Sequence, residues 1–237
     1  MGSPQAFAEF AIWYVIFIFT MTFHEGAHSL VARLGGDDTA YRSGQVSLNP
    51  WPHIRREVFG TVVVPILTFF MSGWMMGWAS APYDPIWARR HPKRHAAMSA
   101  AGPAANLVLA IISFISLRVL LGAGSLVPSN RVGLGYLVEA APGTPPDSLI
   151  HAVAFTLSVA LSLNLLLFLF NLIPIPPLDG SGVLQGLMPG RVGRFIESIG
   201  TNPMMSLMGL MLAWRVAGYL LRPVFSVVVF FLYHGHY

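Results

Sequence analysis

The residue types best suited to chemistry stand together in His24-Glu25-Gly26-Ala27-His28. Residues at positions i and i+4 lie on one face of a helix, so His24 and His28 can offer two ring nitrogens to one metal ion. Glu25 follows the first histidine and is placed to reach a water molecule bound to that ion. Two imidazole ligands with an adjacent carboxylate base are what metal-assisted hydrolysis requires, and zinc is the usual ion for this set.

The setting of this motif favours a functional interpretation. Residues 10–23, which precede it, are almost entirely apolar. A lone histidine on an apolar face is more often a packed core residue, and a bare His-Glu-x-x-His also occurs by chance. Two histidines and a glutamate at the end of a membrane-type helix are costly, however, and such groups indicate function by default.

A third metal ligand can come from Asp179, far along the chain. Leu-Asp-Gly is ordinary turn chemistry, so Asp179 by itself reads as a turn residue. Beside a histidine pair that lacks a third partner, it is better read as a ligand, because two histidines, a carboxylate and a water form an open catalytic zinc sphere. The chain has no cysteine to supply a thiolate. We therefore predict one Zn²⁺ ion held by His24, His28 and Asp179.

Three asparagines lie within the apolar runs, where a buried amide needs a hydrogen-bond partner. Asn171 has two interpretations: it caps backbone groups freed near Pro174, or it binds the substrate carbonyl and the oxyanion that forms from it. Asn164 is expected to join helices. Asn106, together with Gly102, is expected at a close helix contact near the site.

The elements that must position these residues are membrane helices. Of the 237 residues, 54% are hydrophobic and only 10% are charged, whereas soluble domains carry roughly 25% charged residues. We therefore expect an all-α polytopic membrane protein, with one domain over residues 1–237 and about five to six membrane segments. The net charge of +4 is small and lies near the ends of apolar runs. That pattern indicates membrane topology and excludes nucleic-acid binding as the main function.

The apolar runs place the membrane segments at 7–34, 57–81, 96–121, 149–173 and 204–233. Pro65 and Gly73 interrupt the second run, which either spans the membrane or dips in and returns. Arg215 and Pro223 interrupt the last run, which is either one kinked span or two short pieces. Residues 41–50 predict a short β-hairpin or extended loop, either a plain connector or an edge that pairs with the backbone of an unfolded substrate.

The arginines and lysines predict the orientation. They gather around residues 37–56 and within 82–95, whereas 122–146 holds a single arginine. By the positive-inside rule, the first two loops face the cytoplasm and the third faces out. This requires an even number of crossings between them and favours a re-entrant path for 57–81, with its bend at Pro65 or Gly73. The histidine pair and Asp179 then lie at the same, cytoplasmic depth.

Taken as an ordered set, these motifs resemble the site-2 protease family of intramembrane zinc metallopeptidases. The set comprises His24 to His28 in one membrane helix, 101–106 opening another and 171–180 closing a third. The resemblance, closest to small bacterial members, implies that His24, His28 and Asp179 bind zinc, Glu25 activates water and Asn171 steadies the substrate. It also implies a bacterial inner-membrane protein that cleaves locally unwound transmembrane proteins from a cytoplasm-facing site.

Two other functions compete with this one. A membrane metal-binding or transport protein could use the same ligands as a pathway, but it would need further acidic or histidine residues along the other spans, which are nearly devoid of them. A non-catalytic scaffold of the same fold is opposed by the intact Glu25. We expect the lipid bilayer and a transmembrane protein as partners, while the substrate's identity and the oligomeric state stay open.

Overall fold

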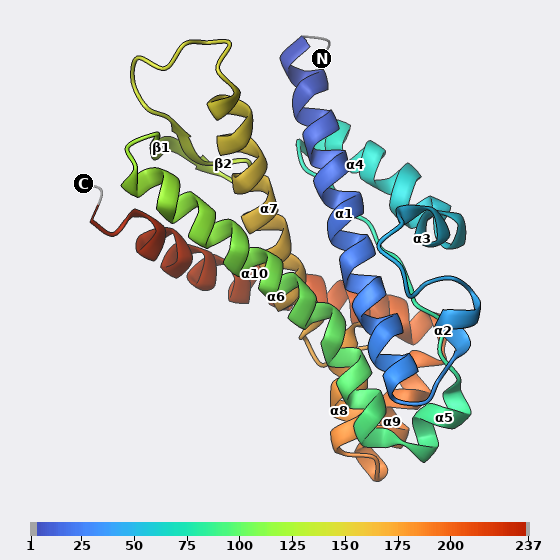
Figure 1. Ribbon diagram of the computed structural model, residues 1–237. Coiled ribbons are helices and arrows are strands. Elements are labelled where there is room, and N and C mark those ends of the chain that lie inside the picture. The colour runs from blue at the N-terminus through green and yellow to red at the C-terminus, as the bar shows by residue number, and fades with distance from the viewer. Residues whose placement is uncertain (1–3, 236–237) are drawn as a thin grey trace.

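The computed structural model describes residues 4–235 and is mostly helical (Figure 1). Within this range, four helices are long and apolar enough to cross a membrane: α1 (Pro4–Leu34), α6 (Pro92–Gly122), α7 (Leu149–Asn171) and α10 (Pro203–Tyr233). The prediction of a helical membrane protein is confirmed. The last apolar run is one continuous helix, α10, with Pro223 inside it.

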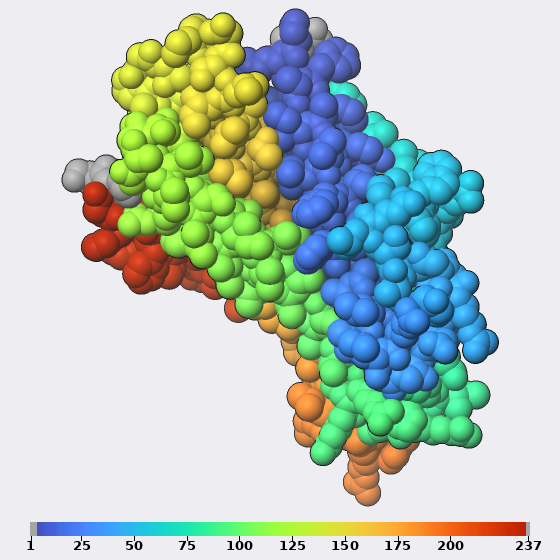
Figure 2. All heavy atoms as spheres, viewed as in Figure 1, coloured from blue at the N-terminus to red at the C-terminus, as the bar shows by residue number. Residues whose placement is uncertain are grey.

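Shorter elements connect these helices. They are α2 (Thr39–Arg42), α3 (Pro50–Arg56), the π-helical turn η1 (Phe59–Val63), α4 (Val64–Ser72), α5 (Pro85–Arg90), β1 (Leu126–Gly133), β2 (Tyr136–Ala140), α8 (Asp179–Leu187) and α9 (Arg191–Gly200). Figure 1 shows α5, α8 and α9 at one end of the molecule and the β1–β2 pair near the other. The space-filling view shows the same elongated shape, with residues of α8 and α9 in orange at its narrow end (Figure 2).

Helices α1, α6 and α7 pack against one another, and α8 packs on the first half of α6. Two glycines of α8 make this second contact close. A Cβ atom at Gly182 would lie 2.3 Å from the Oγ of Ser99, and one at Gly186 would lie 2.3 Å from the carbonyl oxygen of Pro92. Because larger side chains would push α8 away from α6, these glycines hold the start of α8 beside the membrane core.

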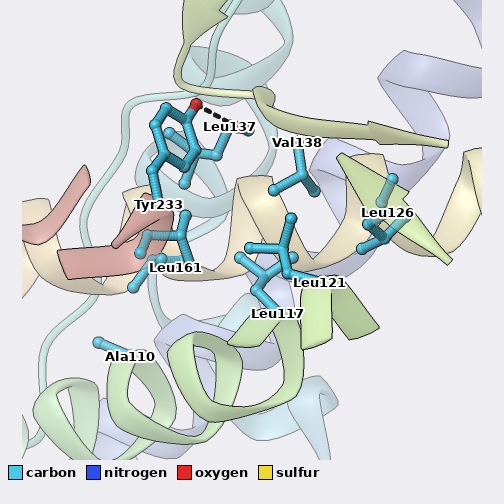
Figure 3. Close-up of a cluster of buried hydrophobic side chains, with 10 residues drawn as sticks. Ala110, Leu117, Leu121, Leu126, Leu137, Val138, Leu161 and Tyr233 are labelled. Carbon is cyan, nitrogen blue, oxygen red and sulfur yellow. Dashed lines mark hydrogen bonds between the residues drawn. The ribbon is translucent and has the colours of Figure 1, made fainter. Parts of the chain in front are cut away.

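The far end of the molecule has an apolar core (Figure 3). Its buried members from α6, α7 and the hairpin include Leu117, Leu121, Leu126, Leu137 and Leu161. The hydroxyl of Tyr233, at the end of α10, donates a hydrogen bond to the carbonyl oxygen of Leu137. Apolar burial together with this bond ties the last helix to the hairpin.

The sequence predicted a short β-hairpin or an extended loop at 41–50; the structure has a loop there, and the two-stranded sheet lies elsewhere. Strands β1 and β2 pair antiparallel within 126–140, a stretch expected to be a loop. Residues 41–50 form no strand; they contain the end of α2, a loop over 43–49 and the start of α3. The physical reason is helix capping: the Oδ1 of Asn49 accepts the Trp51 amide, and Pro50 occupies the first turn of α3, where proline is favoured.

The apolar stretch 57–81 enters and returns beside itself. Its helical part ends at Gly73, which has a positive φ of +79°. The chain then runs back without helix or strand structure, and the Trp78 amide donates to the Gly60 carbonyl oxygen at 3.1 Å. At the open end, the Oγ of Ser80 donates to the Oε1 of Glu57 at 2.6 Å. The chain thus reverses at Gly73, as a re-entrant path requires.

Candidate metal centre

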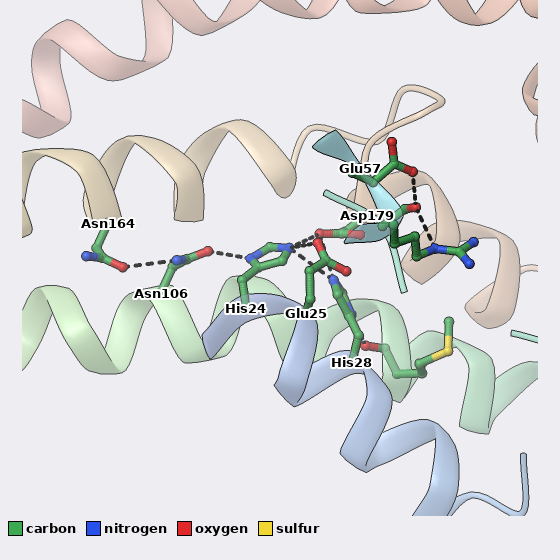
Figure 4. A network of polar contacts seen from close by, with 10 residues as sticks. His24, Glu25, His28, Glu57, Asn106, Asn164 and Asp179 are labelled. Atoms are coloured by element: carbon green, nitrogen blue, oxygen red, sulfur yellow. Dashed lines mark hydrogen bonds and ion pairs between the residues drawn. The ribbon is translucent and has the colours of Figure 1, made fainter. Parts of the chain in front are cut away.

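Three ligand-type atoms from two distant parts of the chain converge on one point (Figure 4). The Nε2 atoms of His24 and His28 lie 3.0 Å apart, and the Oδ2 of Asp179 lies 3.1 Å from the first and 3.3 Å from the second. Ligands bound tetrahedrally at zinc distances are about 3.3 Å from one another. The structure therefore places these atoms where three zinc ligands belong, although the histidines come from α1 and the aspartate begins α8.

Hydrogen bonds from α6 set the orientation of both imidazole rings. The Nδ1 of His24 donates to the Oδ1 of Asn106 at 2.6 Å, and the Nδ1 of His28 donates to the carbonyl oxygen of Met98 at 2.7 Å. With Nδ1 protonated, each Nε2 carries a free lone pair directed at the common point. A metal-binding histidine usually has this arrangement, because the partner of its other nitrogen fixes the tautomer.

Asp179 completes the donor set. Its Oδ2 faces the Nε2 atoms of both histidines, and a carboxyl group that binds a metal ion does so in its ionised form. Its Oδ2 is buried and makes no conventional hydrogen bond to any residue that the structure describes. Lone pairs from two nitrogens and one oxygen facing one point repel one another unless a cation lies between them. The residues present therefore fit Zn²⁺.

Glu25 lies beside the ligands. Its Oε1 is 4.0 Å from the Nε2 of His24, and its side chain is buried. One ligand-type atom from each of His24, Glu25 and His28 lies within 4.8 Å of the others. A carboxylate at this distance suits a base that contacts a metal-bound water, as its position in the sequence suggested.

Gly102 leaves room for both imidazoles. A Cβ atom at this position of α6 would lie 2.3 Å from the Nε2 of His28 and 2.6 Å from that of His24. No real Cβ atom tolerates such contacts, so α6 can approach the ligands only with glycine here. Sequence reasoning gave Gly102 a packing role, and the structure shows that what it packs against is the ligand pair itself.

A cavity of about 410 Å³ opens beside the centre. Glu25, His28 and Asp179 contribute to its lining, and so do polar side chains from the loop before α5 and from α5, α6, α8 and α9, namely Ser80, Tyr83, Arg89, His95, Gln185 and Glu197. The Nη1 of Arg89 donates to the Oε1 of Glu197 at 2.8 Å and joins α5 to α9 at this cavity. Burial and the charge of Glu197 raise the pKa of Tyr83. Such a polar space gives water access to the buried ligands.

The structure does not bring every predicted residue to this site. His24, Glu25, His28 and Asp179 meet, whereas Asn171 ends α7, is partly buried and is not among the described residues that line the cavity. Sequence reasoning gave Asn106 only a packing role. Its side chain instead holds a metal-ligand candidate, and the available signal was an amide placed among the small residues that open an apolar helix.

Comparison with known proteins agrees with this geometry. Residues 12–214 match the family model described as Peptidase family M50. Over 176 residues, the chain is 36% identical to the "Putative zinc metalloprotease YwhC" of Bacillus subtilis (strain 168). These residues make up 74% of this chain and 68% of that protein. No solved structure matches the chain. The range that matches the family model contains His24, Glu25, His28 and Asp179.

Proposed function

The chain belongs to peptidase family M50, and from this premise we propose that it is an intramembrane zinc metalloendopeptidase whose substrates are transmembrane proteins. The observation that supports the proposal most strongly is the convergence of the Nε2 atoms of His24 and His28 with the Oδ2 of Asp179. With Glu25 beside them, these residues supply three ligands, a base and one open coordination position.

The chemistry divides between the ion and the chain. A bound zinc ion lowers the pKa of a coordinated water to about 7 and polarises the peptide carbonyl. Glu25 accepts the proton of the attacking water and delivers it to the leaving amine. Asp179 and the two histidines hold the reacting centre at one place, and α6 prevents the rings from turning away.

A transmembrane substrate must lose helical structure before it is cut, because its peptide groups are engaged in i→i−4 hydrogen bonds. The unwound segment then needs partners for its backbone inside the membrane. Residues 44–50, considered for this role, form a loop and the start of α3 and are not among the described residues that line the cavity. Ala79, Ser80, Ala81 and Tyr83, in a segment that is neither helix nor strand, do line the cavity, so their segment is the better candidate for pairing with the substrate backbone.

The distribution of charge supports the orientation. Arginines and lysines concentrate in the loops at the metal-centre end, so the site faces the cytoplasm by the positive-inside rule. In a bacterium this corresponds to the inner membrane. Reporter fusions at Pro82 and Gly135 should report opposite sides of the membrane, and fusions that report the same side would contradict this topology.

The proposal is tested by Glu25→Gln in the purified, zinc-loaded protein. The wild type is first screened in lipid vesicles against a panel of single-span membrane proteins, and a cleaved member becomes the substrate. The variant should retain bound zinc while cleavage falls to background, because the amide cannot accept the proton. Glu139→Gln, on the exposed face of β2, is the matched control and should cleave normally. Normal cleavage by Glu25→Gln would refute the proposed mechanism.

A further inference from the structure

A chain of buried polar side chains runs from the metal centre into the membrane core (Figure 4). The Nδ1 of His24 contacts the Oδ1 of Asn106 at 2.6 Å, the Nδ2 of Asn106 donates to the Oδ1 of Asn164 at 3.0 Å, and the Nδ2 of Asn164 donates to the Oγ1 of Thr20 at 3.1 Å. Asn106 is 0% exposed and Asn164 is 1% exposed. Buried amides between apolar helices are expensive unless each of their atoms has a partner.

The chain of hydrogen bonds has a fixed direction. An amide has one oxygen that accepts and one nitrogen that donates. The Nδ2 of Asn164 donates both to Thr20 and to the carbonyl oxygen of Ala160, the latter at 2.9 Å, so its oxygen must face Asn106. The nitrogen of Asn106 must then face Asn164, and its oxygen must face His24. Turning either amide around would set two donors or two acceptors against each other.

This direction determines the tautomer of His24. An amide oxygen at Nδ1 requires a proton on Nδ1, and the Nε2 lone pair is then free for the ion. An amide nitrogen in that place would favour the other tautomer, whose Nε2 proton would point at the metal position. His28 differs, because its Nδ1 is held by the backbone carbonyl of Met98, which has no freedom to turn around. Only His24 depends on side chains for its tautomer.

The same chain ties three spans together. Thr20 lies one turn before His24 on α1, so the chain leaves α1 through α6 and α7 and returns to α1 one turn away. A shift of α6 or α7 along its own axis would break at least one of these bonds. The positions of α1, α6 and α7 along their axes are thus coupled to the orientation of the His24 imidazole.

We propose that Asn106 and Asn164 are positioning residues for the metal centre: Asn106 fixes the orientation and tautomer of the His24 ring, and Asn164 fixes Asn106. The inference rests on the metal centre of the proposed function. Removal of such a supporting partner typically weakens metal binding by about 10–100-fold.

The test measures zinc affinity by competition with a chelator, and thermal unfolding without added zinc, for a graded set of variants. Asn106→Leu should bind zinc about 10–100-fold more weakly than the wild type. Asn164→Leu should have a smaller effect, and Thr20→Val the smallest, because Asn164 keeps its bond to Ala160. Asn106→Asp keeps an acceptor for the Nδ1 proton but sets a carboxylate oxygen against the Oδ1 of Asn164, so its zinc affinity should lie between those of Asn106→Leu and the wild type.

Asn202→Ala is the control for stability alone. Asn202 caps α10 by accepting the amides of Met204 and Met205 and is not part of the chain of hydrogen bonds. This variant should unfold more easily while its zinc affinity is unchanged. The proposal is overturned if Asn106→Leu binds zinc like the wild type, if Asn106→Asp is as weak as Asn106→Leu, or if Asn202→Ala weakens zinc binding equally.

Zinc affinity is independent of peptidase activity, so the two proposals can fail separately. A protein that binds zinc with the graded affinities but cleaves no substrate would retain the positioning role and lose the proposed reaction. If cleavage required Glu25 but Asn106→Leu changed neither cleavage nor zinc affinity, the proposed reaction would stand and the positioning role would be lost.

Discussion

The two ends of α6 are buried in different ways. Its first half faces the metal centre with Gly102 and Asn106, and the Met98 carbonyl binds His28. Its second half places Leu117 and Leu121 in the apolar core beneath the hairpin. Both halves have a buried face. Directional hydrogen bonds and close steric fit hold the first half in place, whereas the buried apolar area and the side-chain volume stabilise the second.

This difference predicts different responses to substitution. A buried polar network loses its function when one member is misplaced, because the remaining groups stay buried without partners. An apolar core tolerates changes that conserve volume and loses stability in proportion to what is removed. Metal binding should therefore be sensitive at the first end, and unfolding free energy at the second.

The largest contrast should come from two glycine-to-alanine changes in α6. Gly102→Ala places a Cβ against both ligand nitrogens and should weaken zinc binding by at least about 100-fold, beyond the loss of a supporting partner. Gly122→Ala meets nothing within 4 Å. It should leave zinc affinity unchanged and raise helix stability by up to about 1 kcal/mol. Competition with a chelator measures the zinc affinity of both variants. Equal affinities would show that the two halves of α6 do not differ in their effect on metal binding.

A smaller effect, on stability alone, is expected at the hairpin end. Leu137 of β2 is fully buried in the apolar core, so Leu137→Ala should lower the unfolding free energy by about 2–5 kcal/mol. Leu149→Ala, at an exposed position of α7, is the matched control and should change it by no more than about 0.5 kcal/mol. Denaturation in detergent gives both values. If Leu137→Ala weakened zinc binding while still folded, the two ends would not be independent.

The smallest expected effect depends on pH. The hydroxyl of Tyr136 on β2 donates to the Oε1 of Glu9 at 2.7 Å, and burial and this carboxylate raise the pKa of Tyr136 to about 12. A group with a raised folded-state pKa keeps its stabilisation below the unfolded-state pKa of about 10. That stabilisation is lost as the pH rises through the folded value. Tyr136→Phe should flatten the fall in melting temperature over this range, and an unchanged slope would show that the contact contributes nothing.

Much of the site could be predicted because its signals are local or chemically restrictive. The spacing of His24 and His28 places them on one helical face wherever the helix lies. A chain without cysteine leaves few ligand types, so Asp179 stood out once a third ligand was needed. The charge bias around 57–81 favoured a re-entrant path, and the chain does turn back within this stretch, at Gly73.

Other features could not be predicted, because they depend on how helices rotate and meet. The sheet formed at 126–140 and not at 41–50, since Asn49 and Pro50 start a helix and the hairpin completes an apolar core built by distant residues. The alternation of residues in the sequence does not show which segment such a core will accept.

The sequence by itself determined the membrane helices and the chemistry that the first of them carries, because hydrophobic length and i, i+4 spacing act within one element. Only the tertiary structure decided which partners complete that chemistry. It brought Asp179 to the ring nitrogens, turned Asn106 toward His24 and left Asn171 away from the cavity. The reason is that a hydrogen bond or a metal site requires its atoms to be placed to within a few tenths of an ångström. The packing of the helices against one another sets those positions.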